Sequence, residues 1–122
     1  MEVIILEATL KAMGAQAGTF FLLDEDSQEL FVVATSGYPV DASHLRLKMG
    51  QGLAGQCAQS DLPILTDDIA TDHRIRMPEA FRDLHKALCV PLKSSEEILG
   101  VLLVCFTETG LPSPNEVNML TL

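Results

Sequence analysis

The apolar residues near the start of the chain follow a helical period. One stripe has the spacing i, i+3, i+7 and i+10, and it consists of Val3, Leu6, Leu10 and Met13. A second apolar flank runs beside it and consists of Ile4, Ile5, Ala8 and Ala12. A helix with two apolar flanks needs packing partners on more than one side. The pattern therefore predicts a helix that ends near Gly14, with one flank available to a second copy of the chain.

Five later segments have the composition of β-strands, because they are rich in β-branched, aromatic and leucine residues. They are residues 18–23, 29–35, 45–49, 87–92 and 98–106, with 63–66 as a further short extended piece. Polar turns separate the first two segments and the last two. Strands joined by such short turns pair antiparallel, so each of these couples predicts a hairpin.

The remaining segments predict short helices and one polar stretch. Small residues at 53–60 indicate a helix after Gly50-Gln51-Gly52, and Pro78 opens a short helix within the polar residues 67–86. Ser113 followed by Pro114 predicts the cap of a final helix. Strands in hairpins with helices at the two ends make an α+β domain. We expect residues 1–122 to be one domain, excised from a longer protein.

Composition and charge exclude several classes of function. The chain has 122 residues, of which 48% are hydrophobic, and its formal net charge is −9. An acidic chain is a poor binder of nucleic acid or of anionic membranes. It shows no apolar run long enough to span a bilayer and no signal peptide. Three cysteines with no CxxC pair fit a reducing cytoplasm.

Sequence motifs for cofactors and metals are incomplete. Residues 50–55 match GxGxxG, but the preceding segment alternates as a half-exposed strand, whereas a dinucleotide site needs a buried parallel strand there. A tight turn and close helix packing explain the glycines instead. Asp24 and Asp26 begin like a calcium loop, yet Glu29 stands where that loop needs glycine. We expect no resident cofactor or metal and no local signature of catalysis.

The basic residues are unevenly distributed. Half of them lie within 13 residues, at Arg74, Arg76, Arg82 and Lys86, with His73 and His85 beside them. Acidic neighbours predict a solvated, salt-bridged helix. The alternative is a mobile cap that offers positive charge to an anionic ligand.

Several segments, in their order, resemble the GAF domain, a small-molecule sensor and dimerisation module. They are 18–26, 50–56, 63–68, 87–92, 98–102 and 111–116. The resemblance implies a central antiparallel sheet of five to six strands with the terminal helices on one face. It also implies that residues 50–86 cover a pocket on the other face. Such domains usually precede a histidine kinase, a diguanylate cyclase or phosphodiesterase, or a sigma-factor activator.

The resemblance, together with residue chemistry, defines a candidate site. Its predicted residues are Thr19, Leu53, Ala54, Cys57, His73 and Arg76. Thr19 is the polar exception on an apolar strand, and the two basic residues come from the stretch expected to cover the pocket. We expect a small ligand that is anionic or carries a carboxylate or phosphate, and a homodimer formed through the terminal helices. The alternatives are a purely structural dimerisation module and a small thiol-dependent enzyme.

Overall fold

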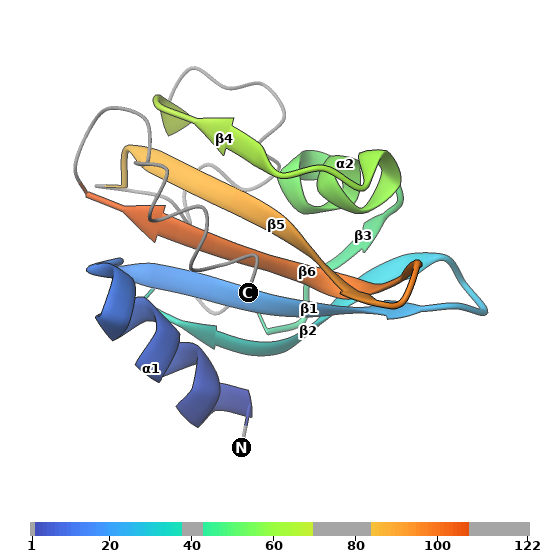
Figure 1. Ribbon diagram of the computed structural model, residues 1–122, viewed down its shortest axis with the longest axis horizontal. Coiled ribbons are helices and arrows are strands. Elements are labelled where there is room, and N and C mark those ends of the chain that lie inside the picture. Colours follow the sequence, from blue (N-terminus) through green and yellow to red (C-terminus); the bar gives the residue numbers. More distant parts are fainter. Residues whose placement is uncertain (1, 38–42, 70–83, 108–122) are drawn as a thin grey trace.

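The computed structural model describes residues 2–37, 43–69 and 84–107, which form a curved antiparallel sheet with helices packed against it (Figure 1). The elements are α1 (Glu2–Met13), β1 (Ala17–Asp24), β2 (Glu29–Ser36), β3 (Arg46–Lys48), α2 (Gly52–Ser60), β4 (Ile64–Thr66), β5 (Lys86–Ser94) and β6 (Glu97–Phe106). The six strands lie in the order β3-β2-β1-β6-β5-β4, and every pairing is antiparallel. The predicted α+β class and both hairpins are confirmed.

The sheet is buried on both sides, and the alternation of side chains along each strand divides the core into two clusters. On the α1 face, Leu6, Leu10 and Met13 of the helix pack with Ala34, Leu88, Val90, Val104 and Phe106. On the α2 face, Leu53, Ala54, Cys57 and Ala58 pack with Phe21, Ala87, Cys89, Val101, Leu103 and Cys105. Because β5 and β6 contribute side chains to both clusters, their sequences are continuous apolar runs and do not alternate between apolar and polar residues.

The two apolar flanks of α1 have different surroundings. Leu6 and Leu10 are only 2% and 5% exposed, and burying each such side chain stabilises the fold by about 1.5–3 kcal/mol. Ile4 and Ile5, on the second flank, are 69% and 54% exposed. The helix ends where Gly14 takes a φ of +69°, a conformation that costs glycine little. The predicted helix and its stop are confirmed.

The glycines of the GxGxxG motif bring α2 close to the sheet. Gly50 and Gly52 have φ of +86° and +69°, which makes the tight turn between β3 and α2. A Cβ on Gly55 would lie 2.5 Å from the carbonyl oxygen of Lys48. Since no parallel strand precedes the motif, it packs a helix and does not form a dinucleotide-binding unit.

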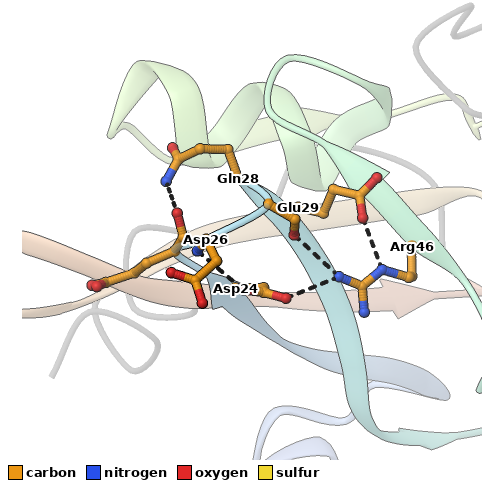
Figure 2. Close-up of polar contacts among 7 residues, drawn as sticks. Asp24, Asp26, Gln28, Glu29 and Arg46 are labelled. Atoms are coloured by element: carbon orange, nitrogen blue, oxygen red, sulfur yellow. Dashed lines mark hydrogen bonds and ion pairs between the residues drawn. The ribbon is translucent and has the colours of Figure 1, made fainter.

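An ion-pair cluster holds β3 on the β1–β2 hairpin (Figure 2). The Arg46 guanidinium donates hydrogen bonds to Glu29 Oε1 at 2.9 Å and to Asp24 Oδ2 at 3.3 Å, and it lies 5.7 Å from the centre of the Phe31 ring. Partial desolvation opposes ionisation of Asp24. Hydrogen bonds from Ser27, Asp26 and Arg46 outweigh it and lower the Asp24 pKa. The hydrogen bond to Glu29 raises the pKa of Arg46.

At its far end α2 is fastened to the sheet by a second ion pair. Asp61 takes a left-handed conformation and donates its N–H to the carbonyl of Cys57 at 2.9 Å, which ends the helix. Its carboxylate accepts a hydrogen bond from Lys93 Nζ on β5 at 2.8 Å. The position of α2 is therefore set at both ends, by glycine packing at one and by an ion pair at the other.

Two predicted helices, at Pro78 and after Ser113, lie outside the described residues. Among the residues that the structure describes, no helix is long and apolar enough to cross a membrane.

We predict that Gly55→Ala will lower the free energy of unfolding by about 1–3 kcal/mol, because the new Cβ must displace the backbone at Lys48. Gly14→Ala is the control, since it also adds a methyl group at a glycine but has nothing within 4 Å of the new atom. It should cost about 1 kcal/mol, from its positive φ alone. Urea denaturation of both variants measures the difference, and equal losses would contradict the packing role of Gly55.

Candidate functional site

Four of the predicted site residues lie on the α2 face. Leu53, Ala54 and Cys57 belong to its core cluster, with exposed fractions of 4%, 2% and 0%. Thr19 is 3% exposed and pairs directly with Leu103, which belongs to the same cluster. The structure thus brings residues from β1 and α2 to one face. His73 and Arg76 lie outside the described residues, so their part in the site stays a prediction.

A row of paired strand residues crosses the sheet through Thr19. In spatial order it runs from Thr35 through Thr19, Leu103 and Cys89 to Ile64. Directly paired residues present their side chains on the same face of a sheet, so the whole row faces α2. Two threonine hydroxyls therefore stand side by side at one end of an otherwise apolar row.

Thr35 was not predicted as a site residue, and a β-bulge explains why. The pairing with β1 shifts between Phe20 and Phe21, so that Val33 is an extra residue on β2. Leu30 and Val32 face α2, whereas Ala34 faces α1. If side chains alternated strictly along β2, Thr35 would lie on the other face of the sheet from Leu30 and Val32. The extra residue of the bulge places it on the same face.

The Thr35 hydroxyl is unusual in its hydrogen bonding. Among the described residues, its Oγ1 is a buried side-chain oxygen with no hydrogen-bond partner. Buried polar atoms are normally paired, and an unpaired one costs about 1–3 kcal/mol. The hydroxyl therefore has a hydrogen-bonding capacity that the described residues leave unused.

The first turn of α2 lacks a side-chain cap. Gln51 occupies the cap position but makes no capping hydrogen bond, and its Oε1 instead accepts the N–H of Lys48 at 3.0 Å. The first turn also carries no acidic residue. Helix N-terminal amides hold partial positive charge, so this turn is electrostatically suited to an acceptor oxygen.

The three cysteines are core residues. Cys57, Cys89 and Cys105 are not disulfide-bonded, and their exposed fractions in the α2-face cluster are 0%, 1% and 0%. They lie on a helix and two strands, as the sequence predicts. In residues 2–37, 43–69 and 84–107, no group of His, Cys, Asp and Glu is placed to hold a metal ion. These thiols act as small apolar side chains in the packing.

Lys86 corrects one expectation from the sequence. It belongs neither to a solvated helix nor to a cap, because it begins β5 and is only 4% exposed. It pairs with Phe106, which belongs to the α1 face, and its Nζ lies 4.7 Å from the centre of the Phe106 ring. The aliphatic stem and the aromatic ring together make this burial tolerable. Lys86 is therefore on the opposite face of the sheet from Thr19.

The fold and the glycine turn agree with a comparison against known families. A family model described as the GAF domain matches residues 3–122. The chain belongs to the GAF domain family. The predicted resemblance is confirmed, and the antiparallel sheet with α1 on one face and α2 on the other is the family's architecture as the sequence led us to expect.

Individual relatives extend the picture of this GAF domain. A Nif-specific regulatory protein of Herbaspirillum seropedicae is 31% identical over 109 residues, which are 82% of this chain and 20% of that protein. The chain thus spans about a fifth of the length of that relative. The GAF domain of a Coxiella burnetii phosphoenolpyruvate-protein phosphotransferase is 26% identical with a TM-score of 0.85, over 97% of this chain and 72% of that one.

The same fold occurs in an enzyme. A free methionine-R-sulfoxide reductase of Neisseria meningitidis, solved with its substrate, superposes with a TM-score of 0.81 at 20% identity. The match covers 97% of this chain and 68% of that one. At this identity the likeness concerns the fold alone.

We predict that the native protein will react with an aromatic disulfide reagent at least about a hundredfold more slowly than the denatured protein, because all three thiols are buried. Ser60→Cys is the matched control. It places a thiol on the exposed end of the same helix that carries Cys57, and this added thiol should react at once. Fast labelling of a native thiol in the unmodified chain would contradict the packing role and favour a thiol-dependent enzyme.

Proposed function

We propose that this GAF domain is a regulatory sensor that binds a small anionic ligand on the α2 face and biases an attached output domain. The observation that carries the proposal is the uncapped, acid-free first turn of α2, which lies on the same face as the hydroxyl-bearing end of the Thr19 row. The match to a Nif-specific regulatory protein supports the regulatory role.

The chemistry of the α2 face favours an acceptor-rich ligand. Among the described residues no Asp or Glu side chain is buried, so no buried carboxylate opposes an anion on this face. The backbone amides of the first α2 turn and the Thr35 hydroxyl are the polar groups available to a ligand, and both can donate hydrogen bonds. In the proposal His73 and Arg76 add positive charge, which offsets the field of a chain with net charge −9.

Strand β1 gives a mechanical route from ligand to helix. Thr19 faces the proposed site, whereas its neighbour Gly18 faces α1, where an added Cβ would lie 2.6 Å from Cδ2 of Leu10. Leu10 therefore fills the space beside Gly18, so that a shift of β1 toward the helix has to be met by a shift of α1. A ligand that prefers one position of β1 therefore changes the population of α1 arrangements.

The second flank of α1 supports the proposed homodimer. Ile4 and Ile5 are large apolar residues on adjacent positions and are more than half exposed. Two copies that pack these flanks together would remove both from water, and a change in α1 packing would then reach both copies at once. Dimerisation through this helix also explains why its sequence has two apolar sides.

For the output domain and the cellular location, we propose general classes. We expect a cytoplasmic protein in which this domain is followed by a histidine kinase, a cyclase or phosphodiesterase, or a sigma-factor activator. The regulatory relative supports an attached regulatory output without distinguishing these three. A structural dimerisation module is the second candidate, favoured by the exposed flank of α1. A thiol-dependent enzyme is third, with three buried cysteines against it.

We predict that a small oxyanion or carboxylate will bind the protein and that Arg76→Ala will weaken this binding by about 1.5–3 kcal/mol, the value of a hydrogen bond to a charged group. Calorimetric titration with nitrate, inorganic phosphate and succinate measures the affinity, and native mass spectrometry detects a ligand retained from the cell. Lys93→Ala is the control, because it removes the same charge at the Asp61 ion pair. Equal affinities of the two variants would contradict a role for Arg76.

We predict that replacing Ile4 and Ile5 together by glutamine will shift the protein from dimer to monomer at tens of micromolar, because the variant removes the apolar surface to be buried. Glu7→Gln is the control on an exposed position of the same helix. Light scattering measures the mass. A dimer that survives the double substitution would place the interface elsewhere.

A further inference from the structure

The buried hydroxyl of Thr35 makes no hydrogen bond to another described residue. Its Oγ1 lacks a hydrogen-bond partner among the described residues, and it sits on a strand where valine has the same shape and an equal β-preference. A valine there would leave nothing unpaired. The hydroxyl therefore calls for an explanation outside the packing of the sheet, such as a group that arrives from elsewhere.

Thr35 lies at an edge of the sheet that the described strands form. Strand β3 pairs with β2 only at residues 29–31, and the pairs farther along β2 are all with β1. Among the described strands, the part of β2 that carries Thr35 therefore has a neighbour on one side only. Thr35 pairs directly with Thr19 on the neighbouring strand, so a molecule bound over Thr19 on the α2 face also lies beside Thr35.

The Thr35 hydroxyl and the first-turn amides of α2 can both donate hydrogen bonds. A threonine hydroxyl can donate to an incoming acceptor, and among the described residues no buried Asp or Glu competes for that hydrogen bond. The uncapped first turn of α2 also offers N–H groups on this face. The hydroxyl can also accept, but the backbone N–H groups only donate, so the two together favour a ligand that presents acceptor oxygens.

We propose that Thr35 is a ligand-binding residue whose hydroxyl donates a hydrogen bond to a carboxylate or oxyanion oxygen of a ligand bound over Thr19. The inference rests on the proposed function and deepens it, because it assigns a residue to the site and names the group of the ligand that meets it. The unpaired hydroxyl makes the ligand-free domain less stable than it needs to be, and the ligand restores the missing hydrogen bond. Binding of the ligand would then also stabilise the domain, because it supplies the hydrogen bond that Thr35 lacks.

The test compares Thr35→Val, which removes the hydroxyl and keeps the shape, with Thr35→Ser, which keeps the hydroxyl. Thr66→Val is the matched control, because Thr66 is buried on the same sheet and its Oγ1 accepts the N–H of Asp68 at 3.4 Å. Melting temperatures and titrations with nitrate, inorganic phosphate and succinate are measured on the full-length protein, with chloride holding the ionic strength constant.

We expect Thr35→Val to raise the melting temperature of the ligand-free protein by several degrees. It should also weaken the best of the three probes by about tenfold or more, as loss of a hydrogen bond to a charged group requires. Thr35→Ser should bind that probe like the wild type. Thr66→Val should lower the melting temperature and leave the affinity unchanged.

The remaining outcomes separate this inference from the proposed function. If Thr35→Val binds the probe as tightly as the wild type, or lowers the melting temperature, the assignment of Thr35 is overturned while the sensor function stands. If no probe binds the wild type and native mass spectrometry finds no retained small molecule, the proposed function and the assignment of Thr35 both fall.

Discussion

Burial of the sheet on both faces is the constraint on which the rest of the structure depends. Strands β1, β5 and β6 send alternate side chains into two separate clusters, one under α1 and one under α2. A sheet buried in this way cannot hide polar groups on either side without paying for their lost water contacts. Each polar side chain that remains in its interior therefore marks a specific local arrangement, as Lys86 and the paired threonines illustrate in different ways.

The two faces are chemically distinct although they share the same strands. On the α1 face the buried cation of Lys86 lies over Phe106, and the outer flank of the helix remains apolar and exposed. On the α2 face small residues and thiols leave the hydroxyls of β1 and β2 as the polar groups of the Thr19 row. Lys86 and Thr19 therefore lie on opposite faces of the sheet. This separation suits a domain that meets a ligand on one face and a partner chain on the other.

Backbone geometry, rather than side-chain chemistry, accounts for the two local features most relevant to function. Positive φ at Gly50 and Gly52 and the close approach of Gly55 press the start of α2 onto β3, where Gln51 Oε1 accepts the Lys48 N–H instead of capping the helix. The bulge at Val33 returns Thr35 to the α2 face of the sheet. In both cases a local irregularity of the backbone determines which groups face the proposed site.

The sequence by itself determined the elements, because apolar periodicity and turn residues act locally: the stripe of α1, both hairpins and the role of the GxGxxG glycines followed from it. It also located Thr19, Leu53, Ala54 and Cys57 on elements that share a face. Only the tertiary structure decided which face Thr35 and Lys86 occupy. A one-residue bulge reverses the alternation of side chains along a strand, and no particular residue type signals it. The charge of a lysine predicts an exposed side chain, but its long aliphatic stem permits burial beside an aromatic ring.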